Sequence, residues 1–464
     1  MSLSFLDRER TVASRNYNRW LIPPAALAVH LSIGEVYAFS VFKNPLVTHF
    51  DSSLTAIGAI FSIAIVMLGL SAAVLGTWVE RAGPRKAMAA AAVCWSSGFA
   101  IGALGVAGDQ LWLVYLGYGV IGGIGLGIGY ISPVSTLIKW FPDRPGLATG
   151  LAIMGFGGGA LIASPLSESL LSAYAAKPED AIVPAFLTLG VLYLITMSLG
   201  AFTVRVPADD WKPEGYTPPT DENAKSMQTT ADVTANSAIR TPQFWLLWTV
   251  LFCNVTAGIG ILEQASPMIQ DFFSDIDAKE AAGFVGLLSL ANMAGRFIWS
   301  STSDVIGRKP IYMGYLGIGA ALYFILASSG TSGIALFVIT TGVIISFYGG
   351  GFATVPAYLK DLFGGLEVGA IHGRLLTAWA AAGIAGPTIV NRVADSQEAA
   401  GKEGADLYTL SLFIMVGVLV VGFIANLLIR PVAERHHERT EERTQEADRQ
   451  SRFTHEHESE EARR

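Results

Sequence analysis

Charge is scarce in this chain of 464 residues. Asp, Glu, Lys and Arg together make up 15% of the sequence, whereas an ordinary soluble protein carries about 25%. Hydrophobic residues make up 52%. So little charge leaves little surface suited to water, and a helix that crosses a bilayer needs about 20 mainly apolar residues. The composition therefore predicts an all-α membrane protein whose main partner is the lipid bilayer.

Cysteine is almost absent. The two that occur, Cys94 and Cys253, each fall inside an apolar segment. Single buried cysteines usually behave as small hydrophobic residues, so neither a disulfide framework nor a zinc site is expected. The histidines near the C-terminus have no spacing typical of a metal site. We expect no metal and no cofactor.

Signatures of catalysis and of nucleic-acid binding are lacking as well. No P-loop occurs, which argues against an ATP-driven pump, and no group of residues resembles a catalytic constellation. Gly117, Gly119 and Gly122 match a dinucleotide fingerprint, but they lie in an apolar segment and indicate close helix packing instead. Acids outnumber bases in the C-terminal tail, which disfavours nucleic acid. The sequence predicts neither an enzyme nor a nucleic-acid-binding protein.

Twelve apolar segments are present, six on each side of a polar, proline-containing stretch. They predict twelve transmembrane helices in two pseudo-symmetric six-helix bundles. The expected helices are 20–42, 56–78, 87–107, 110–138, 147–171 and 182–204, followed by 243–268, 281–301, 310–328, 332–358, 372–393 and 408–430. The expected divisions are an N-terminal segment (1–19), an N-terminal bundle (20–204), a linker (205–242), a C-terminal bundle (243–430) and a charged tail (431–464).

The distribution of Lys and Arg predicts the orientation in the membrane. With the N-terminus in the cytoplasm, 25 of the 31 Lys and Arg residues lie on the cytoplasmic side, and the opposite orientation would place them outside. The first 19 residues are polar, and no cleavage site follows the first apolar segment. We expect a multi-pass protein of the plasma or inner membrane with both termini, the linker and the tail in the cytoplasm.

A short motif occurs at the same place in each half. ERAGPRK begins at Glu80 between helices 2 and 3, and DVIGRK begins at Asp304 between helices 8 and 9. Each has an acid, a glycine three residues later and a basic pair. Helices 5 and 11 also repeat a spacing: Gly150 precedes Pro165 by 15 residues, and Gly373 precedes Pro387 by 14. Repeated bundles around a central site are common in transporters.

The doubled motif resembles the signature loop of the major facilitator superfamily, over about residues 20–430. The first copy departs from the usual pattern, with Glu80 in place of aspartate and Pro84 before the basic pair. The resemblance implies a secondary transporter that works by alternating access, with the loops as gates. The gating residues that it implies are Glu80, Arg81, Gly83, Arg85, Asp304, Gly307 and Arg308.

Three further stretches resemble the oxalate/formate antiporter family, whose members are relatives of the monocarboxylate transporters. They are YAFSVF with NPL from Tyr37, KWFPDRPGLA from Lys139, and YGGGF from Tyr348 together with Pro356 and DLFG from Asp361. The resemblance implies a small carboxylate as substrate.

Arg296 in helix 8 supports a carboxylate independently. It lies eight residues, or roughly 12 Å, from Asp304 at the helix end. A charge near mid-membrane costs at least about 2.5–3.5 kcal/mol, so Arg296 needs an anionic partner. A guanidinium matches a carboxylate with two parallel hydrogen bonds, and Asn292 lies one turn earlier on the same face. The family resemblance also implies that an arginine here binds the substrate carboxylate. The alternative is a purely structural pair with an internal acid.

The number of intramembrane cations bears on the substrate. The resemblance implies that oxalate exchangers carry a lysine in helix 11 as a second cation, but alignment through Gly373 places Trp379 there. One cation suits a monoanion. We therefore expect a monocarboxylate such as lactate, pyruvate or formate, with an oxalate/formate-type exchange as the alternative.

Aromatic residues are expected to complete the substrate site. Tyr37, Tyr130 and Tyr348 fall in helices 1, 4 and 10, and their hydroxyls are suited to bind a carboxylate. Phe156 and Trp379 are further candidates for its walls. The alternative for each tyrosine is an anchor at the membrane interface.

Proton coupling calls for a titratable group inside the membrane. Glu35 and Glu263, in the first helix of each half, are the acidic candidates. The alternatives are a hydrogen-bonded gate or a partner of Arg296. His30 and His372 are also titratable there, but lone histidines are more often structural. The sequence leaves open whether a proton or a counter-anion completes the cycle.

Two rival functions are compatible with the same features. A proton-driven exporter of other solutes would carry the same loop motifs. A membrane solute sensor would bind carboxylate and signal through the tail without moving it.

Overall fold

The computed structural model describes residues 4–52, 54–175, 177–208, 211–216, 228–229, 231–276 and 278–437. Within these ranges the fold is helical, and twelve long rods account for most of it. Three rods are joined end to end from shorter pieces. One continues from α1 through a 3₁₀ turn into α2, another from α5 through a π-helical segment into α6, and the third from α14 into α15.

The N-terminal half contains six rods. Their helices are α1 (Ile22–Ile33), α2 (Ser40–Phe50), α3 (Leu54–Ala82), α4 (Pro84–Ala107), α5 (Leu111–Val114), α6 (Gly123–Trp140), α7 (Pro145–Tyr174) and α8 (Pro178–Thr203). The 3₁₀ turn spans Gly34–Ala38 and the π-helical segment spans Tyr115–Gly122.

The C-terminal half contains the other six, after the single turn α9 (Ala235–Ala238). Its helices are α10 (Pro242–Phe272), α11 (Ala278–Ile306), α12 (Arg308–Ser329), α13 (Ile334–Phe363), α14 (Val368–Leu375), α15 (Thr377–Ala399) and α16 (Asp406–Leu428). The predicted all-α fold of two six-helix bundles is confirmed. Most helices run a few residues past the predicted apolar segments, because polar residues are tolerated where a helix leaves the hydrocarbon core.

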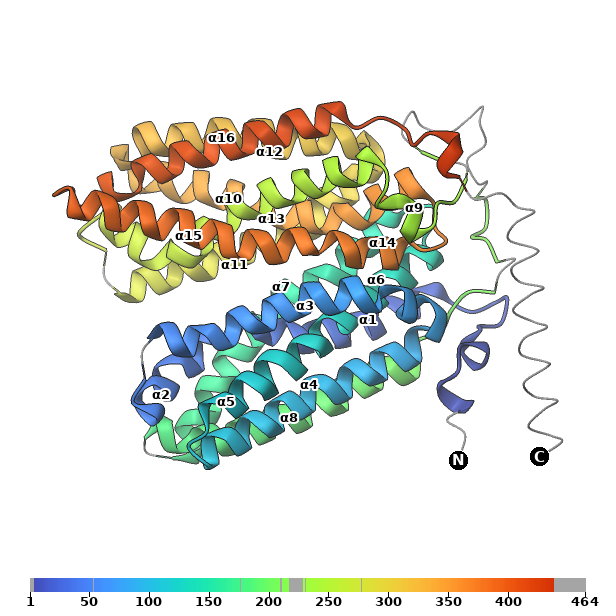
Figure 1. Cartoon of the computed structure of the whole chain (residues 1–464), viewed down its shortest axis with the longest axis horizontal. Helices are drawn as coiled ribbons and strands as arrows, with labels where there is room; N and C mark the ends of the chain where they lie inside the picture. Colours follow the sequence, from blue (N-terminus) through green and yellow to red (C-terminus); the bar gives the residue numbers. More distant parts are fainter. Residues whose placement is uncertain are drawn as a thin grey trace.

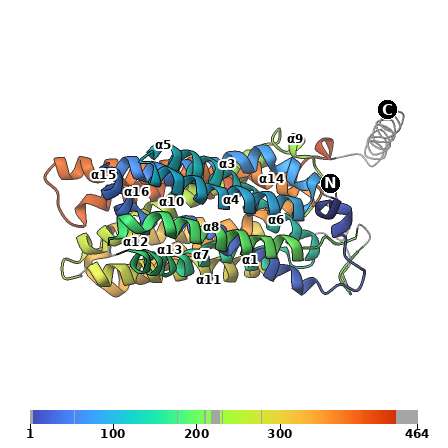
Figure 2. The same ribbon diagram turned by 90° about the horizontal axis from the view of Figure 1, so that it is seen from below.

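Ten helices of the described chain are long and apolar enough to cross a membrane on length and composition alone. The two remaining rods, α11 and α14–α15, run alongside the others in Figures 1 and 2. Their lower hydropathy has a local cause, since α11 carries Arg296 and Asp304, and α14–α15 carries His372 and Arg374.

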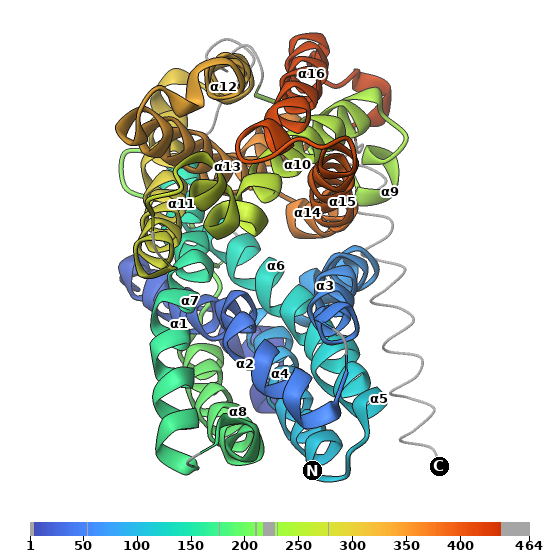
Figure 3. The same ribbon diagram turned by 90° about the vertical axis from the view of Figure 1, so that its left-hand side faces the viewer.

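The two halves form separate bundles that meet along two seams. α7 packs against α11 and α13, while α3 packs against α14 and α15. Figure 3, seen along the rods, shows these seams on opposite flanks. The N-terminal segment and the end of α16 lie at the same end of the molecule, on the right in Figure 1. We call this end the terminal side and the other end the opposite side.

Two glycines let the halves approach closely, and they are the pair that the sequence repeats. A Cβ atom at Gly150 in α7 would overlap the Ser300 hydroxyl of α11. A Cβ atom at Gly373 in α14 would overlap the Ala72 carbonyl of α3. At both seams, therefore, a larger residue in place of one of these glycines would force the two helices apart.

The N-terminal segment is packed under the N-terminal half on the terminal side. Val12 forms an isolated parallel bridge with Val206, beyond the end of α8. Arg19 forms two hydrogen bonds with the carboxylate of Asp143 in the loop between α6 and α7, at 2.5 and 3.0 Å. Although partial burial by itself would raise it, these bonds with Arg19 hold the pKa of Asp143 below its usual range. The segment fixes the loop that precedes α7.

Candidate functional site

Arg296 lies on α11, where this helix packs against α7 of the other half. Its side chain is buried, with 1% of the residue exposed. Its Nε atom donates to Asn292 Oδ1 at 3.0 Å, one turn earlier on α11. Its Nη1 atom donates to the Ile153 carbonyl of α7 at 3.2 Å, across the interface of the halves. Its Nη2 atom has no partner among the described residues. The Nη2 edge of the guanidinium is thus available to a hydrogen-bond acceptor outside the described structure.

Six aromatic rings surround this arginine, three from each half. Phe156 and Phe352 lie 5.8 and 5.5 Å from its guanidinium carbon, measured to the ring centroids. Adjacent ring centroids in the group lie 4.7–5.7 Å apart. The rings belong to Tyr37, Tyr130 and Phe156 of the N-terminal half and to Tyr348, Phe352 and Trp379 of the C-terminal half.

The polar atoms of these rings are buried and unpartnered. The hydroxyls of Tyr37, Tyr130 and Tyr348, the Trp379 Nε1 atom and Arg296 Nη2 all lack a hydrogen-bond partner within the described structure. The charge of Arg296 acts on all three hydroxyls. The Tyr37 hydroxyl also lies near the Tyr348 hydroxyl of the opposite half and near the Arg296 guanidinium, in both cases without hydrogen-bond geometry.

All five of these groups can donate a hydrogen bond, and one of them is charged. A buried donor without an acceptor costs about 1–3 kcal/mol. An anion placed between them would satisfy them together. Arg296 forms no ion pair with a described carboxylate, a set that leaves out the side chain of Glu263. The structure brings all seven predicted substrate-site residues together around the guanidinium of Arg296.

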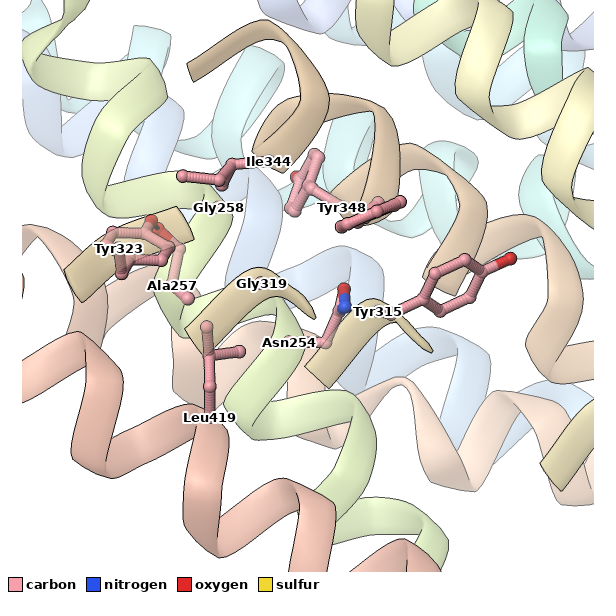
Figure 4. A pocket seen from close by; sticks show the side chains of 10 residues that line it. Asn254, Ala257, Gly258, Tyr315, Gly319, Tyr323, Ile344, Tyr348 and Leu419 are labelled. Carbon is pink, nitrogen blue, oxygen red and sulfur yellow. Dashed lines mark hydrogen bonds between the residues drawn. The ribbon is translucent and has the colours of Figure 1, made fainter. Parts of the chain in front are cut away.

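A small cavity behind Tyr348 is distinct from this centre. It has a volume of about 10 Å³, which is enough for about one water molecule. Figure 4 shows Asn254, Tyr315 and Tyr348 around it, within the C-terminal half. The Asn254 Oδ1 atom is buried without a partner in the described structure. This cavity is too small for an organic acid, and a single buried water suits it.

Glu35 lies away from Arg296, in the interior of the N-terminal half. It is fully buried in the 3₁₀ turn after α1, and its Oε2 atom accepts a hydrogen bond from Tyr118 at 3.0 Å. Tyr118 in turn packs against Trp95 and Phe99. Glu35 is therefore not the partner of Arg296. The side chain of Glu263, the other predicted acid, is outside the described part of the structure.

The two acids of the loop motifs each bind the other half of the molecule. Asp304 accepts hydrogen bonds from the backbone N–H groups of Gly146 and Leu147, both at 2.9 Å, where α7 begins. Glu80 accepts one from the N–H group of Gly369 at 3.0 Å, where α14 begins. A carboxylate is favoured at a helix N-terminus by the helix dipole and the free N–H groups. The two contacts are related by the pseudo-symmetry and close the terminal side.

The glycines of the two motifs have the same backbone conformation. Gly83 and Gly307 have φ angles of 82° and 99°, a region that favours glycine, and each is the residue just before a helix. They turn the chain sharply from α3 into α4 and from α11 into α12. The spacing of acid and glycine in the sequence thus reflects a helix end followed by a tight turn.

The basic residues of the two copies have different contacts. Arg308 bonds to Asp304 at 2.6 Å and to Asp361 at 3.2 Å. Arg85, its counterpart, instead donates to the Phe5 carbonyl at 2.9 Å. Arg81 is exposed. Lys139 in α6 provides the cation beside Glu80 in the first copy. The departure of the first copy from the usual pattern thus coincides with a change of partner, in which Arg85 holds the N-terminal segment.

Comparison with known proteins identifies the family. The family model of the Major Facilitator Superfamily matches residues 25–387 and 268–458. The chain belongs to the major facilitator superfamily. It is therefore a membrane transporter and not an enzyme.

This facilitator is similar to several proteins that are named as carriers of small carboxylates. It is 27% identical to an oxalate:formate antiporter from Oxalobacter formigenes, over 80% of this chain and 83% of that protein. It is 27% identical to apicoplast pyruvate carrier 1 from Toxoplasma gondii, over 60% of this chain and 59% of that one. It is 30% identical to human monocarboxylate transporter 11 over 39% of this chain and 37% of that protein.

Solved structures agree on the fold of the facilitator. The Escherichia coli fucose:proton symporter superposes with a TM-score of 0.65 at 16% identity, covering 88% of this chain and 99% of that one. A bacterial homologue of the iron transporter ferroportin gives a TM-score of 0.63 at 12% identity, over 88% and 98%.

Two contacts of the site, Phe352 and the Ile153 carbonyl, were missed by sequence reasoning, which considered His30 and His372 only as titratable groups. Phe352 lies one helical turn after Tyr348 and is part of the same motif, so helical periodicity would have found it. The Ile153 carbonyl has no sequence signal, because it contributes only its backbone. His30 and His372 lie on either side of Tyr130, with ring centroids 5.4 and 5.8 Å away. Their proximity depends on how the two halves meet.

Proposed function

We propose that this facilitator carries a small monocarboxylate, of the lactate, pyruvate or formate type, through the site at Arg296. The observation that carries the proposal is the group of five buried, unpartnered donors, in which four neutral groups accompany the Nη2 atom of Arg296. A carboxylate accepts hydrogen bonds in about four directions on its two oxygens. A fifth donor matches an oxygen on the neighbouring carbon, as in a 2-oxo or 2-hydroxy acid.

The charge of the site supports a monoanion over a dianion. Arg296 is the permanent cation of the described centre, and on α15 Trp379 stands where the resemblance to oxalate exchangers implies a lysine, with its ring against Tyr130. The aromatic rings around Arg296 are uncharged. The second carboxylate of a dianion would therefore find no permanent cation among them. Burying an unpaired charge is costly. A monoanion is neutralised by Arg296 alone.

The closed terminal side supports alternating access around this site. Asp304 and Glu80 bind helix N-termini of the opposite half, and Gly150 and Gly373 allow the seams to close. Rocking of the halves would break these contacts and expose the site to the terminal side. We propose that this side is the cytoplasm, because most Lys and Arg residues would then be cytoplasmic.

Anion exchange is the second candidate for the transport cycle. The similarity to an oxalate:formate antiporter over 80% of this chain favours it. In that cycle a second carboxylate returns through the same site, and no proton is needed. Proton symport and anion exchange differ in whether a proton gradient drives accumulation.

The proposal is tested with purified protein in lipid vesicles. We expect uptake of labelled pyruvate or lactate by the wild type, and loss of that uptake in Arg296→Gln. Arg392→Gln is the matched control, because it makes the same change at an exposed arginine of α15, and it should transport normally. Wild-type uptake by Arg296→Gln would remove this mechanism. Uptake of oxalate in preference to every monocarboxylate would show that the single-cation argument is wrong.

A further inference from the structure

His30 has an unusual pair of hydrogen-bond partners. It lies on α1 and is fully buried. Its Nδ1 atom is 2.8 Å from the Ala152 carbonyl oxygen of α7, and its Nε2 atom is 3.1 Å from the Tyr130 carbonyl oxygen of α6. Both distances are those of hydrogen bonds. Both partners are acceptors that cannot donate.

A neutral imidazole satisfies only one of these two oxygens. It has one N–H group and one lone pair, whereas the protonated ring has two N–H groups. In the neutral ring, one nitrogen lone pair therefore faces a carbonyl oxygen. Protonation replaces that repulsive contact with a second, charge-assisted hydrogen bond. The two carbonyl acceptors thus favour the protonated ring, while burial of its charge opposes protonation.

His30 and the group of donors at Arg296 are linked through two helices, α6 and α7. On α7, the Ala152 carbonyl faces His30 and the next carbonyl, that of Ile153, accepts from Arg296. On α6, the Tyr130 backbone faces His30 while its hydroxyl is one of the unpartnered donors near Arg296. On α7, consecutive carbonyl groups thus contact His30 and Arg296. On α6, the backbone and the side chain of one residue face the two groups.

Other titratable groups also surround His30. Arg296 of α11 acts on it with its positive charge. Tyr130 of α6 stacks on its ring, and His372 of α14 lies beyond Tyr130, with neither ring nitrogen partnered in the described structure. Glu35 follows on the same rod but is bonded to Tyr118. Two nearby cations, Arg296 and a protonated His30, repel each other unless an anion lies close to them.

We propose that His30 binds the proton that travels with the carboxylate. The inference rests on the proposed function and names the residue that couples it to protons. A carboxylate on Arg296 offsets the repulsion between the two cations, so it increases the proton affinity of His30. By reciprocity, a proton on His30 increases the affinity for the carboxylate by the same factor. The carrier then moves a neutral pair of anion and proton.

The first test uses the unmodified protein. Calorimetry of pyruvate binding in two buffers of different ionisation enthalpy counts the protons bound with the substrate. We expect uptake of about one proton per pyruvate near neutral pH. Binding without proton uptake would overturn the role of His30 but leave the carboxylate carrier intact. No binding of any carboxylate would instead contradict the proposed function.

The second test separates His30 from Glu35 with two matched neutral variants. His30→Gln should retain exchange of labelled for unlabelled pyruvate, but lose about tenfold or more of the accumulation driven by a proton gradient. Glu35→Gln should keep both activities. Full gradient-driven accumulation in His30→Gln, or its loss in Glu35→Gln alone, would contradict the proposal. Should His30→Gln fail to fold, the calorimetric proton count on the wild type still decides.

Discussion

Arg296 combines a fixed charge with a planar donor edge, and its two neutral contacts use only part of that edge. Nε and Nη1 bind an amide and a carbonyl, neither of which neutralises the charge. The residue is held in place by the protein and is left without a counter-ion in the described structure. The fixed position orients the guanidinium towards a substrate. The lack of a counter-ion leaves its charge available, because an arginine already paired with a protein carboxylate would have to break that pair to bind an anion.

Arg296→Lys tests whether geometry adds to charge. Lysine keeps the charge but loses the planar fork that gives two parallel bonds with a carboxylate. Loss of one charge-assisted hydrogen bond costs about 1.5–3 kcal/mol. We therefore expect pyruvate affinity to fall by about 10- to 100-fold in calorimetry, with uptake still detectable at high substrate. Equal affinity in the two proteins would mean that the charge alone binds the substrate.

Tyr130→Phe should separate stability from binding. The Tyr130 hydroxyl is buried without a partner, so its removal relieves a cost of about 1 kcal/mol and should raise the melting temperature without substrate. The same change removes a substrate donor and should weaken pyruvate binding several-fold. Tyr312→Phe is the control, because that hydroxyl donates to the Gly351 carbonyl at 2.5 Å. It should lower the melting temperature and leave binding unchanged.

At the scale of helices, the structure explains why the loop motif occurs twice. Each acid lies in the last turn of a helix of one half and accepts hydrogen bonds from the first N–H groups of a helix in the other half. The contacts exist only when the terminal side is closed, so they stabilise one of two conformations. Gly83 and Gly307 supply the turns, and their φ angles exclude most other residues.

Asp304→Asn should shift the molecule towards the state that is open on the terminal side. The change weakens two hydrogen bonds of a carboxylate to a helix N-terminus, and the expected shift in the conformational equilibrium is at least about tenfold. A cysteine at the buried Thr149, in a protein without Cys94 and Cys253, should then react faster with maleimide. Asp180→Asn, an exposed acid, should leave the rate unchanged. An unchanged rate in Asp304→Asn would contradict the gating role.

The close approach of α14 to α3 gives a second prediction for helices. Gly373→Ala places a methyl group against the Ala72 carbonyl, so the seam on the terminal side must open or the protein must lose stability. The same change at Gly342 meets nothing within 4 Å and should be neutral or stabilising by up to about 1 kcal/mol. Thermal unfolding and the Thr149 cysteine assay check both. Equal behaviour of the two variants would mean that α14 and α3 do not pack this tightly.

Much of the element-scale description could be predicted from the sequence. The apolar segments predicted the long helices, and the repeated motifs predicted that the two halves are related by pseudo-symmetry. What could not be predicted depends on tertiary contact. Arg85 was expected at the gate, but it holds the Phe5 carbonyl, because the N-terminal segment occupies that place. Glu35 is predicted as a proton-coupling residue or as a partner of Arg296, and the 3₁₀ turn directs its carboxylate towards Tyr118, which removes the second of these roles.

At the scale of the whole molecule, the site exists only where the halves meet. The N-terminal half supplies Tyr37, Tyr130 and Phe156, and the C-terminal half supplies Arg296 and Trp379. Neither half alone surrounds an anion with donors. Rocking of one half against the other therefore changes access to the site and takes the site apart at the same time, which links substrate release to the opening of a gate.

Competition against labelled pyruvate uptake tests the central claim most directly. Wild-type protein in vesicles is offered unlabelled lactate, oxalate or the neutral methyl ester of pyruvate at the same concentration. We predict strong inhibition by lactate and little by oxalate or by the ester, because the site neutralises one negative charge and needs one. Strong inhibition by the neutral ester, with none by lactate, would contradict the account of Arg296 as the carboxylate-binding residue of a monocarboxylate carrier.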